Sequence, residues 1–148
     1  MRITQEADYA IRIVCRLAQS EERKVSAAEV SDSSAVSVRF TLKILHKLVT
    51  GGVVKSYKGA NGGYVLARDA ADITLRDIIE LIDGPLAISK CIHDGHECSR
   101  EGHDKSECIL YHIFCKLNDE VAGKLGRITI ANVADKNTDL GAVLKILN

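Results

Sequence analysis

The sequence predicts a mainly α-helical fold with one small β-hairpin, and three observations lead to this prediction. Apolar residues recur at helical spacing over residues 4–18 and 38–49. Two short segments rich in β-branched and aromatic residues, 53–57 and 64–67, flank the glycine-rich stretch 58–63. Near the end of the chain, an apolar stripe from Leu110 to Ile128 with spacings of three and four predicts a long helix.

The expected helix starts carry residues that cap helices well. Thr4 precedes the first helix, Ser26 and Glu29 form a capping-box pattern, and Ser37 precedes the next helix. A short helix and a longer one joined by a few small residues have the layout of a helix-turn-helix, although an ordinary helical hairpin has the same layout. We expect the longer helix to bury Val38, Leu42, Leu45, Leu48 and Val49.

The hairpin decides between these two layouts. A β-hairpin directly after the second helix is the wing of a winged helix-turn-helix, and a further helix follows from Thr74 to Gly84-Pro85. The late apolar stripe needs a partner surface, for which a second copy of the chain is the simplest candidate. We therefore predict a winged helix-turn-helix DNA-binding domain over 1–85, a cysteine-bearing loop over 86–107, a dimerisation helix region over 108–133 and a tail over 134–148.

Charge is divided unevenly along a chain whose formal net charge is zero. Residues 1–68 hold eleven Lys/Arg against six Asp/Glu, and residues 69–148 reverse this surplus with nine against fourteen. Polyanion binding depends on where positive charge lies, so the first half can bind DNA. For any single lysine a solvated surface role is equally compatible with the sequence, and Phe40 suits either a thymine methyl or the core. The candidate DNA-contacting residues are Ser37, Arg39, Phe40, Lys43, Lys47, Lys58, Gly59, Asn61, Gly62 and Tyr64.

Five cysteines are present, and an odd number fits poorly with a disulfide framework. Cys15 lies in the first helix among apolar residues, where it suits a small core position. The other four fall within 25 residues, which points to metal or redox chemistry.

Several segments together resemble the IscR/NsrR/CymR (Rrf-two) family of winged-helix transcription regulators. They are residues 8–12 (DYAIR), 37–40 (SVRF), 59–67 (GANGGYVLA), 73–79 (ITLRDII) and 83–85 (DGP). The resemblance covers about residues 1–130. It implies a homodimer that binds a pseudo-palindromic operator in double-stranded DNA, with the long C-terminal helix at the dimer interface.

Some members of that family bind an iron–sulfur cluster, 4Fe–4S or 2Fe–2S, through three cysteines. The resemblance implies this role for Cys91, Cys98 and Cys108, which are spaced more widely here, and for Asp8 of the other subunit as fourth ligand. Cys115 is the substitute ligand. If Cys108 is already helical, however, the two lie about 10.5 Å apart along the axis.

The sequence is also compatible with other interpretations. Asp8 lies four residues before Arg12, so an exposed ion pair also accounts for it. The cysteines with His93, His96 and His103 would suit zinc. The expected function is a regulator that senses redox state, iron or nitric oxide through a cluster; the alternative is a zinc-binding or cluster-free thiol-sensing winged-helix regulator.

Several classes of protein are disfavoured. No apolar run approaches the length of a membrane span, and the charged N-terminus lacks a signal-peptide core, so we expect a cytoplasmic protein. The sequence shows neither a nucleotide-binding glycine loop nor a convincing nucleophile–base pair. We therefore expect neither an enzyme nor a small-molecule substrate.

Overall fold

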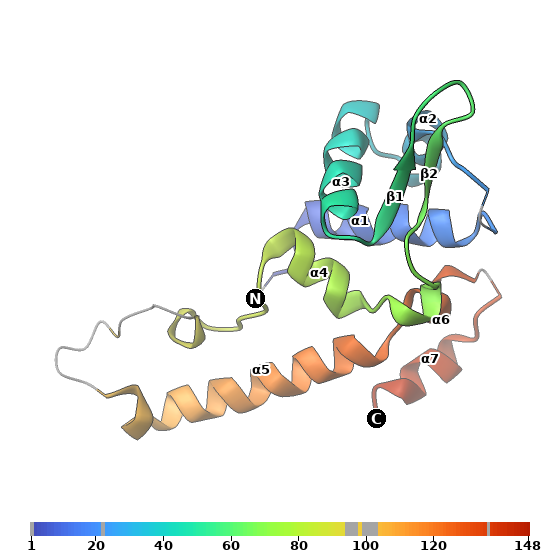
Figure 1. The fold of residues 1–148 in the computed structure, drawn as a ribbon. Helices are drawn as coiled ribbons and strands as arrows, with labels where there is room; N and C mark the ends of the chain where they lie inside the picture. The colour runs from blue at the N-terminus through green and yellow to red at the C-terminus, as the bar shows by residue number, and fades with distance from the viewer. Residues whose placement is uncertain (1, 22, 94–97, 99–103, 136) are drawn as a thin grey trace.

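A computed structural model describes residues 2–21, 23–93, 98, 104–135 and 137–148. Figure 1 shows α2, α3 and a hairpin above α1 and α4, with α5 running beneath them. The fold class predicted from the sequence, mainly helical with one small hairpin, is confirmed. The elements are α1 (Gln5–Ala18), α2 (Ala27–Ser34), α3 (Val38–Thr50), β1 (Val54–Tyr57), β2 (Gly63–Leu66), α4 (Leu75–Asp83), α5 (Ile109–Arg127), α6 (Ile130–Ala134) and α7 (Leu140–Ile146), with 3-10 turns η1 (Ala70–Asp72), η2 (Lys90–Ile92) and η3 (Lys105–Glu107).

Side chains cap the helices where the sequence places them. The Thr4 hydroxyl accepts a hydrogen bond from the Ala7 amide at 3.2 Å, and Ser37 accepts one from Phe40 at 3.4 Å. Capping boxes begin α2 and α4. Each cap satisfies a helical N–H that otherwise has no partner in its own helix, so the helix starts are fixed by local chemistry.

The hairpin is a two-stranded antiparallel sheet that is tied to the start of the helix-turn-helix. Its register pairs Val54 with Leu66 and Tyr57 with Gly63. Val25, between α1 and α2, exchanges two backbone hydrogen bonds with Tyr64, at 3.0 and 2.9 Å. The wing is thus anchored on both sides, by its own pairing and by the connection before α2.

The core face of α3 agrees with the expected one in part, because Leu45 and Leu48 are fully buried as predicted. Val38 and Leu42, expected to be buried, are 46% and 44% exposed. The reason is that α1 and α2 pack against a face of α3 from which Val38 and Leu42 are turned away. The buried face contains Thr41 and Ile44 in addition to Leu45 and Leu48.

The segment that follows α5 packs into the hydrophobic core formed by the first half of the chain. Ile130 in α6 is fully buried, and its amide donates to the Ile73 carbonyl at 2.8 Å. The Leu75 amide donates to the Ile128 carbonyl at 2.9 Å, so the start of α4 is bonded to the segment between α5 and α6. α6 packs against α1 and η1. Residues of α6 therefore complete the hydrophobic core formed by the first half of the chain.

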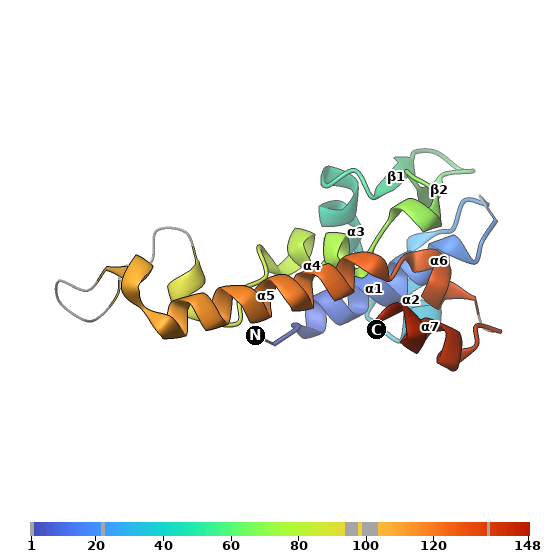
Figure 2. The same cartoon turned by 90° about the horizontal axis from the view of Figure 1, so that it is seen from below.

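α5 extends beyond the compact part of the molecule, as Figure 2 shows from below. Several large apolar side chains on its first half are exposed, namely Ile109, Leu110, Ile113 and Leu117. Ile109 is 75% exposed. Within the described part of the chain, no helix combines the length and apolar character that a membrane crossing requires.

Candidate nucleic-acid interface and cysteine segment

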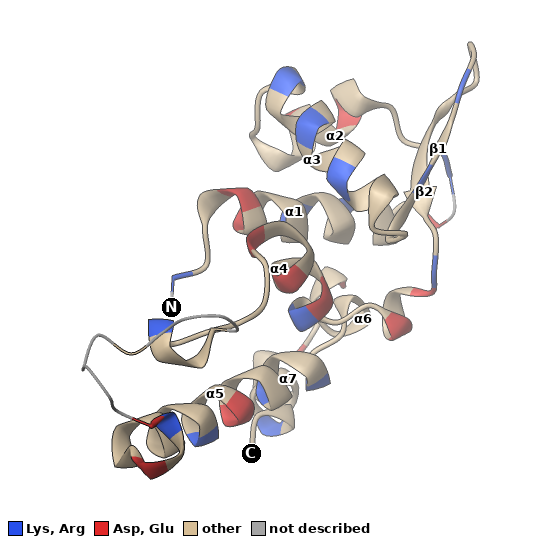
Figure 3. Ribbon diagram, turned by 60° about the vertical axis from the view of Figure 1, so that its left-hand side comes forward, with Lys and Arg blue, Asp and Glu red and all other residues tan. Residues whose placement is uncertain are grey.

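The start of α3 presents polar and cationic groups outward. Ser37 and Arg39 are exposed, and Figure 3 shows lysine and arginine positions along α3 and on the hairpin. Phe40 is half-buried, packs against the core and meets Tyr9 edge-to-face with ring centroids 5.9 Å apart. Part of the Phe40 ring is thus used in packing α3 against α1.

Lys43 and Lys47, predicted as DNA contacts, both pair with Glu6 of α1. Lys47 Nζ lies 2.7 Å from Glu6 Oε1, and Lys43 Nζ lies 3.4 Å from Oε2. The close contact with Lys47 has the largest effect on the pKa of the Glu6 carboxyl and lowers it from its ordinary value; burial opposes this with the next largest effect, and the hydrogen bond from Lys43 lowers the pKa further. Glu6 was not predicted as part of this surface. Lysines four residues apart share a helix face, but only the packing of α1 on α3 brings the carboxylate between them.

The wing residues divide by exposure. Lys58, Gly59 and Asn61 are exposed at the hairpin tip, whereas Gly62 and Tyr64 are half-buried. A Cβ on Gly62 would lie 2.3 Å from the Tyr57 carbonyl oxygen, so this position requires glycine on steric grounds. Gly62 and Tyr64 therefore help to build the hairpin that carries the exposed tip.

The cysteine segment lies along the first half of α5. η2 and η3 both contact α5, and the Ile88 amide donates to Asn118 Oδ1 of α5 at 3.2 Å. Cys91 is in η2, with its sulfur 3.1 Å from Ser89 Oγ, and Cys108 is the N-cap of α5 with extended backbone. Both thiols, like that of Cys98, are free and partly exposed.

Within the described part of the chain, the predicted cluster ligands lie apart from one another. Asp8 lies on α1, where its carboxylate pairs with Arg12 at 2.7 Å, as the ion-pair interpretation predicted. Cys115 lies within α5, seven residues after the N-cap, so about two turns still separate it from Cys108. No group of three or more His, Cys, Asp or Glu that would suit a metal ion occurs in the described ranges. His93 is exposed, and His96 and His103 fall outside the described residues.

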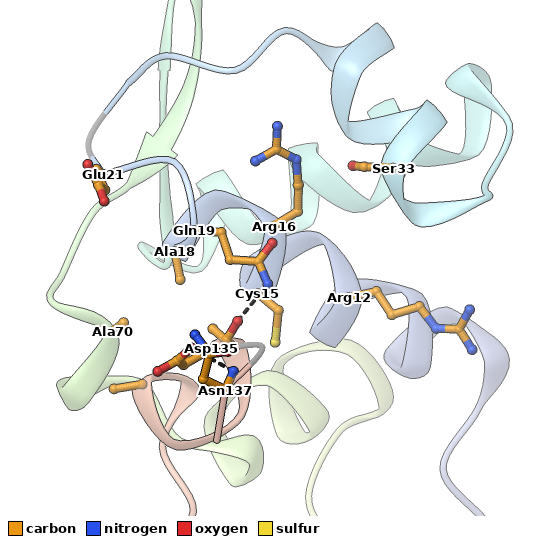
Figure 4. A pocket seen from close by; sticks show the side chains of 12 residues that line it. Arg12, Cys15, Arg16, Ala18, Gln19, Glu21, Ser33, Ala70, Asp135 and Asn137 are labelled. Atoms are coloured by element: carbon orange, nitrogen blue, oxygen red, sulfur yellow. Dashed lines mark hydrogen bonds between the residues drawn. The ribbon is translucent and has the colours of Figure 1, made fainter. Parts of the chain in front are cut away.

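Cys15 lies in the wall of a cleft between α1, η1 and α6, drawn in Figure 4. The cleft has a volume of about 1070 Å³. A hydrogen bond from Gln19 Nε2 to the Ala134 carbonyl, 2.6 Å long, joins α1 to α6 beside it. Burial raises the pKa of the Cys15 thiol to about 11, so the group stays protonated at neutral pH. Cys15 also packs against the core, which agrees with the role expected for it.

Comparison with known proteins identifies similar chains. Residues 3–136 match the model of the Rrf2 family, described as iron-dependent transcriptional regulators. The HTH-type transcriptional regulator IscR of Escherichia coli O1:K1 is 28% identical over 136 residues, which cover 91% of this chain and 81% of that protein. CymR, the global cysteine regulator of B. subtilis, superposes with a TM-score of 0.71 at 25% identity, over 90% of this chain and 96% of that one. IscR of T. potens shares the fold, with a TM-score of 0.67 at 23% identity, over 90% of this chain and 85% of that one.

Proposed function

Because this chain belongs to the Rrf2 family of DNA-binding transcriptional regulators, we propose that it is a homodimer whose operator affinity depends on an iron–sulfur cluster. The observation that carries this proposal is the position of the cysteine segment. Its η2 and η3 turns lie against α5, the helix whose first half exposes an apolar face. A change at the thiols would therefore act next to the surface that we assign to the second subunit.

The DNA contact is assigned to α3 and the wing. Arg39 is exposed near the N-terminus of α3, the part of a recognition helix that enters the major groove, and arginine pairs well with guanine edges. Lys58 at the hairpin tip suits a phosphate or minor-groove contact. Two such domains in a dimer would read the two halves of a pseudo-palindromic operator in the cytoplasm, where bacterial DNA lies.

The dimer contact is assigned to α5. Contiguous exposed apolar side chains on a monomer surface usually mark an interaction site. Ile109, Leu110, Ile113 and Leu117 form such a set within two and a half turns of one helix. Burying this face against a second α5 would remove it from water.

The proposed cluster ligands are Cys91, Cys98 and Cys108, with Asp8 of the other subunit as the fourth. Their chemistry fits, because thiolates are the soft ligands that these clusters use, and the three thiols are free and partly exposed. Since the described residues do not hold three such side chains in one group, the loop has to bring them together on loading. A bound cluster would supply a redox-sensitive and nitric-oxide-sensitive group at this position.

Asp8 would connect this group to the DNA-contacting helix. It lies in the first turn of α1, and α1 packs against α2 and α3. Engaging the Asp8 carboxylate elsewhere would release its ion pair with Arg12. An allosteric effect then needs only a difference in this contact between the loaded and unloaded dimer.

Anaerobic purification followed by absorption spectroscopy and iron, sulfide and zinc analysis tests the cofactor. Cys98→Ser should abolish the visible absorption, whereas Cys15→Ser should leave it unchanged. Asp8→Ala should weaken the cluster or change its spectrum without dissociating the dimer, and Arg12→Ala separates loss of the ion pair from loss of the ligand. A colourless protein that contains zinc would refute the cluster and favour a zinc-binding regulator. A metal-free protein whose DNA binding responds to thiol oxidation would refute the cluster and favour a thiol-sensing regulator.

Gel-shift assays with genomic DNA fragments test the regulator independently of the cofactor. We expect sequence-selective binding that differs between the anaerobic and the air-oxidised protein. Selective binding with the same affinity in both states would support the DNA contact and refute the sensing role.

A further inference from the structure

We propose that Glu6 limits the sequence-independent attraction of α3 for DNA by holding Lys43 and Lys47 on the protein. This inference rests on the proposed function of α3 as the DNA-contacting helix. It assigns to Glu6, on α1, a role in how strongly the contact between α3 and DNA depends on phosphate charge.

The geometry places one carboxylate between two ammonium groups. Glu6 lies in the first turn of α1, and its side chain is only 20% exposed. Its two oxygens face different lysines, Oε1 at 2.7 Å from Lys47 and Oε2 at 3.4 Å from Lys43. Because the lysines are four residues apart, they extend from the same face of α3 and meet the carboxylate together.

A second contact keeps Lys43 near the protein surface. Its ammonium lies 5.4 Å from the centre of the Phe40 ring, in a cation–π arrangement, and Phe40 in turn packs edge-to-face on Tyr9 of α1. Lysine side chains are flexible and strongly hydrated, so without such partners they would sample many positions in solvent. Glu6 and Phe40 together restrict Lys43 to the α1–α3 junction.

This arrangement affects the two kinds of DNA contact differently. A phosphate has to compete with Glu6 for Lys43 and Lys47, and the carboxylate itself repels the backbone. Arg39 has no ion-pair partner in the described part of the chain, so it can contact a base edge without breaking a bond inside the protein. Glu6 thus weakens phosphate binding more than base contact, which favours selectivity.

The test compares Glu6→Gln with the wild-type dimer on a 30-base-pair duplex of random sequence between 50 and 200 mM KCl. Each additional phosphate neutralised steepens the dependence of log K on log salt by about 0.9. We expect Glu6→Gln to bind this duplex about three- to tenfold tighter at 50 mM KCl, with a slope steeper by about one unit. Adding Lys47→Met to Glu6→Gln should reduce both changes.

Glu120→Gln is the matched control. It removes the same charge from another lysine–glutamate pair, with Lys116, on α5 on the opposite side of the molecule from α3 (Figure 1). Sedimentation of both variants checks that they remain dimers. If Glu6→Gln and Glu120→Gln bind the random duplex equally, the role of Glu6 is refuted.

A measurement without DNA separates this inference from the function on which it rests. Carbon-detected NMR titration of the Glu6 carboxyl should give a pKa below the ordinary glutamate value, and Lys47→Met should bring it back up. An unshifted titration would refute the contact itself. Wild-type protein that binds no duplex at any salt concentration would instead refute the DNA-binding function, whatever the NMR result.

Discussion

The Asp83 carboxylate at the end of α4 accepts two hydrogen bonds from Thr4, one from its backbone amide at 3.0 Å and one from its hydroxyl. The same hydroxyl accepts from the Ala7 amide and so caps α1. Asp83 is followed at once by Gly84-Pro85 and the chain that leads to the cysteine segment. The start of the first helix and the exit from the winged domain are therefore held by one pair of side chains.

Asp83→Ala should lower the free energy of unfolding by about 1 kcal/mol, because it removes two hydrogen bonds to a charged group at an exposed site. Thr4→Ala keeps the backbone bond to Asp83 but removes the hydroxyl bond together with the cap, which is worth about a further 1 kcal/mol. Urea unfolding of both single variants and of the double variant gives the coupling energy. Strictly additive effects would contradict the direct contact.

Gly62→Ala should distort the wing, because its Cβ would lie 2.3 Å from the Tyr57 carbonyl oxygen, which belongs to the paired strand. Overpacking of this kind costs about 1–3 kcal/mol, measurable as a lower urea midpoint. Gly123→Ala is the control. Nothing lies within 4 Å of its Cβ, so the helix propensity of alanine should stabilise α5 by about 0.5–1 kcal/mol. Equal effects of the two substitutions would rule out the steric explanation.

Leu117→Glu should convert the proposed dimer into monomers, because it introduces a charge into the exposed apolar face of α5. Sedimentation equilibrium measures the change. Lys116→Ala, at the neighbouring exposed position, should leave the dimer intact. A Leu117→Glu protein that remains dimeric would place the subunit contact on another surface.

The lowered pKa of the Glu6 carboxyl predicts how the stability of the protein changes at acid pH. Its pKa is lowered chiefly by the ion pair with Lys47 and also by that with Lys43, so its contribution to stability is complete above the ordinary value of 4.5 and is lost as pH falls through the lowered value. Wild type should therefore exceed Glu6→Gln in urea midpoint at pH 7, and the difference should close as the pH falls below 4. A difference that persists to pH 2 would show that the ion pairs do not cause it.

Cys15 should resist alkylation in the folded protein. Burial raises its pKa to about 11, which leaves about one thiol in a thousand as thiolate at pH 8. Iodoacetamide labelling followed by mass spectrometry should show Cys15 unmodified until urea is added. Rapid labelling without urea would mean that the cleft wall opens readily in solution.

Local signals predicted much of the fold. Thr4, Ser26, Ser37 and Thr74 mark helix starts through bonds within three residues of each cap, so the sequence carries that information directly. The hairpin followed from β-branched residues around glycines in the same way. Such features depend on chemistry between near neighbours.

The remaining features depend on contacts between distant segments. Val38 and Leu42 were placed in the core together with Leu45 and Leu48 because their spacing suits burial, but the packing of α1 and α2 decides which part of the α3 surface is buried. Glu6 was missed as a partner of α3 because 37 residues separate it from Lys43. The cysteine ligands remain a prediction, since the described residues do not hold three such side chains in one group.

The position of α6 has a consequence for the newly made chain. Since Ile130 closes the core over Ile73 and α6 covers one side of α1, a ribosome-bound chain that ends before residue 130 cannot finish its N-terminal domain. Translation must therefore pass residue 130 before this domain can complete its core. A newly made chain thus acquires its full DNA-contacting domain only after its cysteine segment and α5 have been synthesised.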